Sequence, residues 1–113
     1  MTPEAFDAAC RALPGATMDV LWEVDHVYKV GGRMFAVLGP SGTFSFKASD
    51  LAFEMLVQTG AARPAPYMAR AQWVYFDDPH ALPDEDLKAY LKSAHALTAA
   101  KLTRKLQREL GLG

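Results

Sequence analysis

Residues 26–38, with the sequence HVYKVGGRMFAVL, decide the fold of this chain. Two runs rich in β-branched and aromatic residues flank Gly31-Gly32, and such runs separated by two glycines are typical of an antiparallel β-hairpin. Glycine supplies the positive φ angles that a two-residue hairpin turn requires. We therefore predict two strands, over residues 26–30 and 33–38, joined by a tight turn.

Two further strands are predicted downstream of this hairpin. Residues 39–42 (GPSG) form a second turn, and residues 43–47 alternate so that Phe44 and Phe46 share one face of a third strand. Residues 72–77 (QWVYFD) are apolar and aromatic enough for a fourth strand. The predicted sheet is therefore mostly antiparallel.

Helices are predicted before, between and after these strands. Thr2 caps a first helix that Pro14-Gly15 ends, and Ser49 caps a second helix, marked by Leu51 and Met55, that stops at Gly60. A third helix starts at Asp84, and its leucines keep the helical period as far as Leu110. One helix over residues 84–110 would be about 40 Å long, so we expect its end to overhang or bend.

Two segments have ambiguous patterns. Residues 17–24 fit either an extended lead-in or a short helical turn, and Tyr67-Met68 is a possible extra strand. With these, the element order is α-β-β-β-α-(β)-β-α, which predicts an α+β, two-layer sandwich with helices on one face of the sheet. A length of 113 residues fits one domain over residues 1–113.

The sequence contains no recognisable catalytic template. The glycines lie in hairpin turns rather than between a strand and a helix, and the three histidines lack the spacing of a zinc hydrolase. We expect Cys10 to lie in the core and His95 to be a partly buried or surface residue rather than a ligand. The carboxylates of residues 77–86 could hold Mg²⁺ or Ca²⁺, but they lack EF-hand spacing, and helix capping with solubility explains them better. We predict no enzymatic activity, no cofactor and no metal.

The location of the protein is predicted from what the sequence lacks. A single cysteine forms no internal disulfide, the first residues are acidic where a signal peptide is basic, and no apolar run approaches a membrane span. We therefore expect a cytoplasmic protein with no membrane partner.

The charge changes sign along the chain. The net charge is -1, and by regions it is -4 over residues 1–25, +3 over 26–70, -3 over 71–100 and +3 over 101–113. Basic hairpins can follow phosphates, and the aromatic side chains of Tyr28, Tyr67 and Tyr75 could stack on unpaired bases. The alternative is that the cations lie on a solvent-exposed strand face and that the aromatic residues belong to the core. If acidic and basic blocks mix on the folded surface, DNA binding is disfavoured.

Residues 27–36 (VYKVGGRMFA) resemble the F-K-V-G-G-K-M-F-A hairpin of the small bacterial MmcQ/YjbR proteins. Residues 64–74 (PAPYMARAQWV), Leu13-Pro14-Gly15, Phe46-Lys47 and residues 93–101 extend the resemblance over nearly the whole chain. Tyr28 replaces the usual Phe, and His95 stands where the last helix commonly has an aromatic residue. The resemblance implies a two-layer α/β fold of the secretion-chaperone and frataxin-like kind.

The resemblance also implies DNA binding through two basic hairpin wings. Lys29, Arg33 and Lys47 would lie on or beside the first wing, and Arg63 and Arg70 would flank the second. These cations would contact phosphates, which gives weak, sequence-indifferent affinity. The alternative is a protein-interaction or chaperone-like adaptor domain, for example a homodimer, which the long final helix favours. Metal binding through the acidic residues 77–86, as a frataxin-like fold suggests, ranks third.

Overall fold

The computed structural model of the chain describes residues 1–21, 25–66 and 71–112. Within these ranges, six strands form one antiparallel sheet with the order β1-β2-β3-β4-β6-β5. The strands are β1 (Ala16–Leu21), β2 (Asp25–Val30), β3 (Arg33–Leu38), β4 (Phe44–Lys47), β5 (Arg63–Pro64) and β6 (Trp73–Phe76).

The predicted hairpin is confirmed as β2 and β3. Gly31 and Gly32 occupy its turn with φ angles of 58° and 80°, the left-handed values that favour glycine. The ambiguous segment before the hairpin begins as strand β1, which pairs with β2. The possible strand at Tyr67-Met68 lies outside the described residues.

The first two helices begin at the side-chain caps predicted for them. Thr2 accepts a hydrogen bond from the backbone N–H of Ala5 at the start of α1 (Pro3–Arg11), and Ser49 does the same for α2 (Asp50–Gln58). The third helix, α3 (Asp84–Ala99), begins at the predicted residue.

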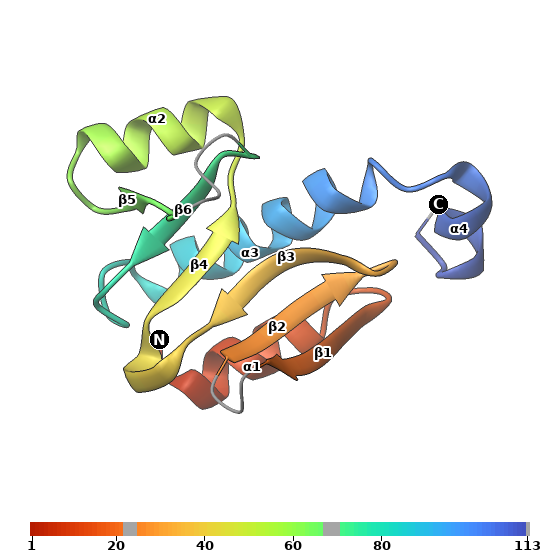
Figure 1. Cartoon of the computed structure of the whole chain (residues 1–113), viewed down its shortest axis with the longest axis horizontal. Coiled ribbons are helices and arrows are strands. Elements are labelled where there is room, and N and C mark those ends of the chain that lie inside the picture. Colours follow the sequence, from red (N-terminus) through yellow and green to blue (C-terminus); the bar gives the residue numbers. More distant parts are fainter. Residues whose placement is uncertain (22–24, 67–70, 113) are drawn as a thin grey trace.

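The single helix over residues 84–110 is wrong, because α3 ends at Ala99 and a separate helix, α4 (Arg104–Glu109), follows. Thr103 starts α4 by accepting a hydrogen bond from the N–H of Leu106. The Gln107 amide donates to the carbonyl oxygens of Ala99 and Leu102, which fixes the turn between the two helices. The break bends the chain, which is one of the two outcomes expected for so long a helix, and Leu102 packs on the β2–β3 hairpin tip. Helix α4 lies beyond the end of the sheet (Figure 1).

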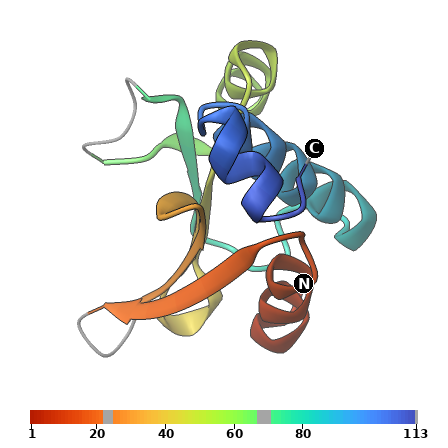
Figure 2. The same cartoon turned by 90° about the vertical axis from the view of Figure 1, so that its right-hand side faces the viewer.

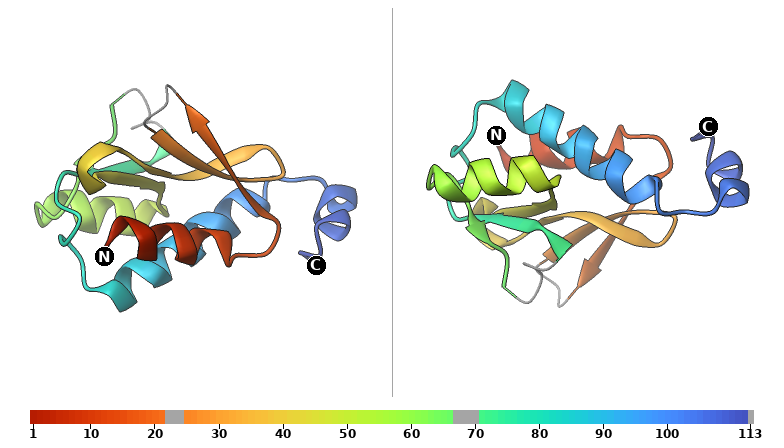
Figure 3. Two further views of the ribbon diagram at one scale, coloured as in Figure 1. Left: turned by 90° about the horizontal axis from the view of Figure 1, so that it is seen from below. Right: turned by 90° about the horizontal axis from the view of Figure 1, so that it is seen from above.

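The helices cover one face of the sheet and leave the other open, as predicted (Figure 2). Helices α1 and α3 lie side by side under the sheet (Figure 3), and α2 packs beside β5 and β6. The strand pairs β1–β2 and β5–β6 reach outward on the open side, one on each flank of it (Figure 2).

The core lies between the sheet and the helices and is rich in aromatic rings. The rings of Phe44 and Phe76 stack with their centroids 4.6 Å apart, and Phe46 stacks on Tyr90 of α3. Cys10 is fully buried in this core, as expected, and burial raises the pKa of its thiol.

Two sequence expectations need refinement. His95 is buried, and its Nε2 lies 2.7 Å from the carbonyl oxygen of Pro14. Leu51 and Met55, whose spacing marks α2, are exposed, and Leu56 is the residue that this helix buries. The apolar residues of α2 therefore outnumber the positions that its contact with the sheet can cover.

Candidate anion-binding site

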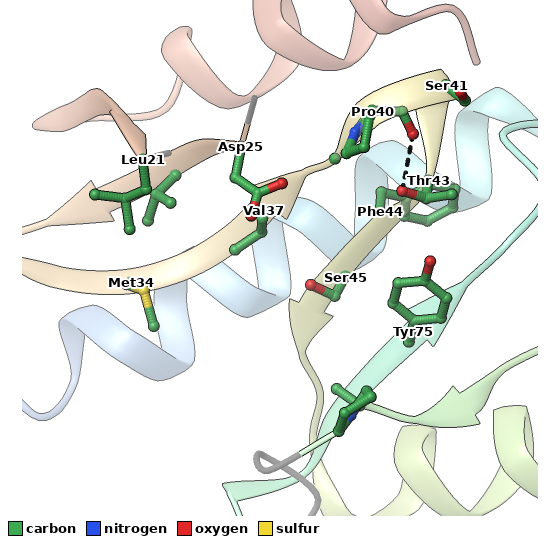
Figure 4. Close-up of a pocket in the computed structure, with 14 residues that line it drawn as sticks. Leu21, Asp25, Met34, Val37, Pro40, Ser41, Thr43, Phe44, Ser45 and Tyr75 are labelled. Carbon is green, nitrogen blue, oxygen red and sulfur yellow. Dashed lines mark hydrogen bonds between the residues drawn. The ribbon is translucent and has the colours of Figure 1, made fainter. Parts of the chain in front are cut away.

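The open face of the sheet is built by the residues that alternate with the core. Because Phe44 and Phe46 point toward the helices, Ser45 and Lys47 of β4 point to the opposite face. Ser45 pairs with Val37 of β3 and with Tyr75 of β6. These three residues therefore form a row across the middle of the open face (Figure 4).

A hollow of about 620 Å³ lies over this row, and we call it the apolar basin. Leu21, Met34 and Val37 stand on one side of it and Tyr75 on the other, with Ser45 between them (Figure 4). Its lining residues are Leu21, Asp25, Val27, Met34, Val37, Gly39, Pro40, Ser41, Thr43, Phe44, Ser45, Ala65, Pro66 and Tyr75. Nearly all of these side chains are apolar or uncharged, and Asp25 is the one ionisable acid among them.

A second hollow, of about 240 Å³, lies farther along the same strands toward the hairpin tip, and we call it the basic hollow. Its lining residues are Arg33, Met34, Lys47, Ala71, Trp73, Thr98 and Lys101. Three of them are cations, which come from the start of β3, the end of β4 and the turn after α3. The fold therefore gathers positive charge from both basic blocks of the sequence at one place.

Gly31 lies at the close contact that brings the turn containing Lys101 to the hairpin. A Cβ on Gly31 would lie 2.6 Å from a methyl carbon of Leu102, so the hairpin tip and the turn after α3 are in close contact. Leu102 is buried, and its neighbour Lys101 lines the same hollow as Arg33.

The positive charge of the basic hollow is poorly compensated. The Lys47 ammonium donates a hydrogen bond to the carbonyl oxygen of Ala71. Burial and the nearby Lys101 lower the pKa of Lys47, and Asp50 opposes this shift. Within the described ranges, none of the ion pairs involves Arg33, Lys47 or Lys101. An anion in the hollow would relieve the repulsion between these cations.

The backbone beside the basic hollow is strained. Gln72 has a φ of 61°, in the left-handed region that non-glycine residues rarely adopt, and such residues cluster at functional sites. Its side-chain amide donates to Asp50, and its carbonyl oxygen accepts from the N–H of Ala48 at 3.0 Å. These bonds hold the neighbouring Ala71 carbonyl toward Lys47.

The five cations predicted to contact DNA separate into different environments. Arg33 and Lys47 meet in the basic hollow. Lys29 pairs with Asp19 across β1 and β2 at 3.0 Å, and Arg63 pairs with Asp77 at 2.9 Å while its guanidinium lies 5.0 Å from the centre of the Tyr75 ring. Acidic and basic blocks therefore mix at Lys29 and Arg63, which disfavours DNA contact at these two positions but does not apply to the basic hollow. Arg70 lies outside the described residues.

Lys101 is the member of the cluster that the sequence prediction omitted. The basic block over residues 101–113 could have indicated that Lys101 belongs to the cation cluster, but in a continuous helix this block would lie far from the hairpin. The break after Ala99 reverses that expectation.

The aromatic residues proposed for base stacking also separate. Tyr28 is fully buried, and its hydroxyl donates to Asp7 at 2.7 Å, so its ring is core and not a stacking surface. Tyr75 lines the apolar basin, and Tyr67 lies outside the described residues.

Three of the acidic residues in 77–86 have partners within the described residues, Asp84 with the N-terminal amine at 3.2 Å, and none of them caps α3. Asp77 pairs with Arg63, and Asp78 accepts a hydrogen bond from the N–H of His80 at 2.8 Å. Among the residues described, no three His, Cys, Asp or Glu side chains come together in a group that could hold a metal ion.

The fold and the site define a small α+β protein in which one sheet face holds the core and the other presents an apolar hollow beside a cationic one. The YjbR family model matches residues 11–97, and the chain belongs to the YjbR family. It is similar to the crystal structure of Deinococcus radiodurans protein DR2400, which has a DUF419 domain, with a TM-score of 0.85 and 25% sequence identity over 99% of this chain and 89% of that one. A comparison with curated proteins gives no match.

These comparisons confirm the resemblance and the fold predicted from the sequence. The family match includes Arg33 and Lys47 but ends before Lys101. In the part of the chain described, none of the helices has both the length and the apolar composition needed to cross a membrane.

Proposed function

We propose that this protein is a non-catalytic DNA-binding module that holds backbone phosphates with Arg33, Lys47 and Lys101. The observation that carries the proposal is the convergence of these three cations, from three separate elements, on one surface hollow. Cations that face solvent without carboxylate partners are the groups that release counterions when they meet phosphates. Lys29 and Arg63 are not assigned to the site, because each already has a carboxylate partner.

The proposed binding is weak and sequence-indifferent. Three phosphate contacts give a slope of log K against log salt of about -2.7 for duplex DNA. The acidic blocks elsewhere on the surface repel a long phosphate backbone, so the contact is expected to be short.

Fluorescence anisotropy of a labelled duplex over a series of salt concentrations tests this proposal. The variants Arg33→Gln, Lys47→Gln and Lys101→Gln should each weaken binding and reduce the salt slope by about one. Lys88→Gln is the matched control, because it removes one exposed cation from the helix face and should leave the slope unchanged. Absence of binding at low salt, or an equal effect of Lys88→Gln, would overturn the proposal.

A homodimeric adaptor is the second candidate function. The long final helix that favoured it is absent, since α3 ends at Ala99, but Leu51 and Met55 are 68% and 51% exposed one helical turn apart on α2. Analytical ultracentrifugation tests this candidate. The unsubstituted protein should sediment as a dimer and the Met55→Lys variant as a monomer; a monomer at all concentrations of the unsubstituted protein would reject the candidate.

A further inference from the structure

The apolar basin and the basic hollow are adjacent on the open face. Met34 lines both of them. On β4, Ser45 of the basin and Lys47 of the hollow are two residues apart on the same face, which is about 7 Å along a strand. On β6, Tyr75 and Trp73 repeat this spacing. One small molecule can therefore occupy both hollows.

We propose that the two hollows form one binding site for a small amphipathic anion, an alkyl or acyl chain that ends in a carboxylate or a phosphate. The chain lies in the apolar basin, and the anionic head lies between Arg33, Lys47 and Lys101. This ligand site goes beyond DNA binding and does not depend on it.

The apolar end has the size and lining of a ligand pocket. Its volume of about 620 Å³ falls within the range of about 300 to 1,000 Å³ that is usual for small-molecule sites. Leu21, Val37 and Pro66 provide aliphatic walls. The ring of Tyr75 already has the Arg63 guanidinium over it, which favours an aliphatic chain over a stacked nucleobase.

The charges at the two ends give the ligand its direction. Arg33, Lys47 and Lys101 stand at the hairpin end, whereas Asp25 lines the apolar basin at the other end. The Arg63 guanidinium over Tyr75 is paired with Asp77. A carboxylate at this far end repels a second anionic group on the ligand. The site therefore accepts a chain with one charged head and rejects a chain charged at both ends.

The length of the site selects a chain of medium length. From Lys47 to Thr43, where the turn containing Pro40 closes the apolar basin, four residues of strand span about 13 Å. An octanoate or octyl phosphate molecule fills this distance, whereas butyrate leaves most of the basin empty.

Isothermal titration calorimetry of the full chain with octanoate and octyl phosphate tests the proposal. Both should bind, and three other compounds should each bind at least about tenfold more weakly. The compound 1-octanol lacks the anionic head, butyrate has fewer methylenes to bury, and octanedioate carries a second carboxylate. Equal affinity for 1-octanol and octanoate would overturn the anionic head. Equal affinity for octanedioate would overturn the orientation set by Asp25.

Variants locate the site. Lys47→Gln should weaken octanoate without changing 1-octanol, and Val37→Asp should abolish octanoate binding. The double variant Leu51→Ser, Met55→Ser is the matched control, because it removes the exposed apolar pair on α2 and should leave octanoate affinity unchanged.

Methyl NMR spectra of the unsubstituted protein provide a readout that does not depend on any variant folding. Octanoate should shift the signals of Leu21, Met34 and Val37. Shifts confined to Leu51 and Met55 would place the ligand elsewhere and refute the site.

Discussion

The two faces of the sheet use the same strands for opposite purposes. On β4 and β6 the helix-covered face carries Phe44, Phe46 and Phe76, which are almost fully buried and stacked on one another. The open face carries the residues between them, including Ser45 and Tyr75, which line the apolar basin. Because side chains alternate along a strand, one short sequence contributes both the core and the surface hollow.

This difference separates stability from binding. The covered face holds the aromatic core, whose side chains are almost fully buried, so substitutions there should change the free energy of unfolding. On the open face Val27 and Trp73 are buried, but Ser45 and Tyr75 are only half-buried. Substitutions at the half-buried positions should therefore change ligand binding and leave unfolding almost unaffected.

The largest expected effect is on the covered face. Phe46→Ala should lower the free energy of unfolding by about 3 to 5 kcal/mol, because Phe46 is fully buried among three aromatic rings. Its neighbour Ser45→Ala, on the open face, should change this free energy by less than about 0.5 kcal/mol. Urea denaturation of both variants measures the contrast, and equal losses would refute the separation of the two faces.

The hairpin tip shows the same contrast in two adjacent glycines. Gly31→Ala and Gly32→Ala both force a non-glycine residue to a positive φ, at a cost of about 1 to 2 kcal/mol each. Only Gly31 faces Leu102, since a Cβ on Gly32 meets nothing within 4 Å. Gly31→Ala should therefore cost about 1 kcal/mol more in thermal or urea unfolding. It should also weaken anion binding, because Leu102 and Lys101 must move; an unchanged affinity would contradict that link.

A smaller effect is expected at the one hydrogen bond between Tyr28 and Asp7. Burial opposes ionisation of Asp7, but hydrogen bonds from Tyr28 and Arg11 outweigh it and lower the pKa of this carboxyl. Tyr28→Phe should cost about 1 to 2 kcal/mol near neutral pH.

The pH dependence of this loss provides its control. A carboxyl whose pKa is lowered on folding adds stability above its ordinary pKa of about 4 and loses it as the pH falls through the folded value. The difference between Tyr28→Phe and the unsubstituted protein should therefore shrink below about pH 4. A difference that stays constant from pH 7 to pH 3 would exclude the Asp7 contribution.

Local signals in the sequence predicted the fold well. The β2–β3 hairpin follows from two glycines between β-rich runs, and α1 and α2 begin at Thr2 and Ser49 because each cap satisfies an N–H three residues later. Such features depend on neighbours in the sequence and are visible there.

The features that failed depend on distant contacts. The leucine period continues through Leu102 and Leu106, so the apolar pattern does not show that α3 ends at Ala99; Thr103, which caps α4, was the one local signal of the break. The break becomes favourable because Leu102 is buried against the hairpin, and Thr103 then caps the next helix.

Two of the three cations of the candidate site were predicted, because they lie in one local segment of the sequence. Arg33 and Lys47 stand in the segment that the charge pattern and the resemblance single out. The pairs Lys29–Asp19 and Arg63–Asp77 join residues that meet only through strand pairing or a loop, so the sequence does not show which cations are compensated.

The contact between Gly31 and Leu102 means that the cation cluster is complete only when the turn after α3 is docked on the hairpin. Arg33 and Lys47 belong to the early sheet, whereas Lys101 joins them only after the turn beyond α3 has docked on the hairpin. In the site proposed above, a bound anion would contact all three cations, and a ligand that binds only the native arrangement stabilises that arrangement. Anion binding should therefore fasten the C-terminal segment to the hairpin and slow its local opening.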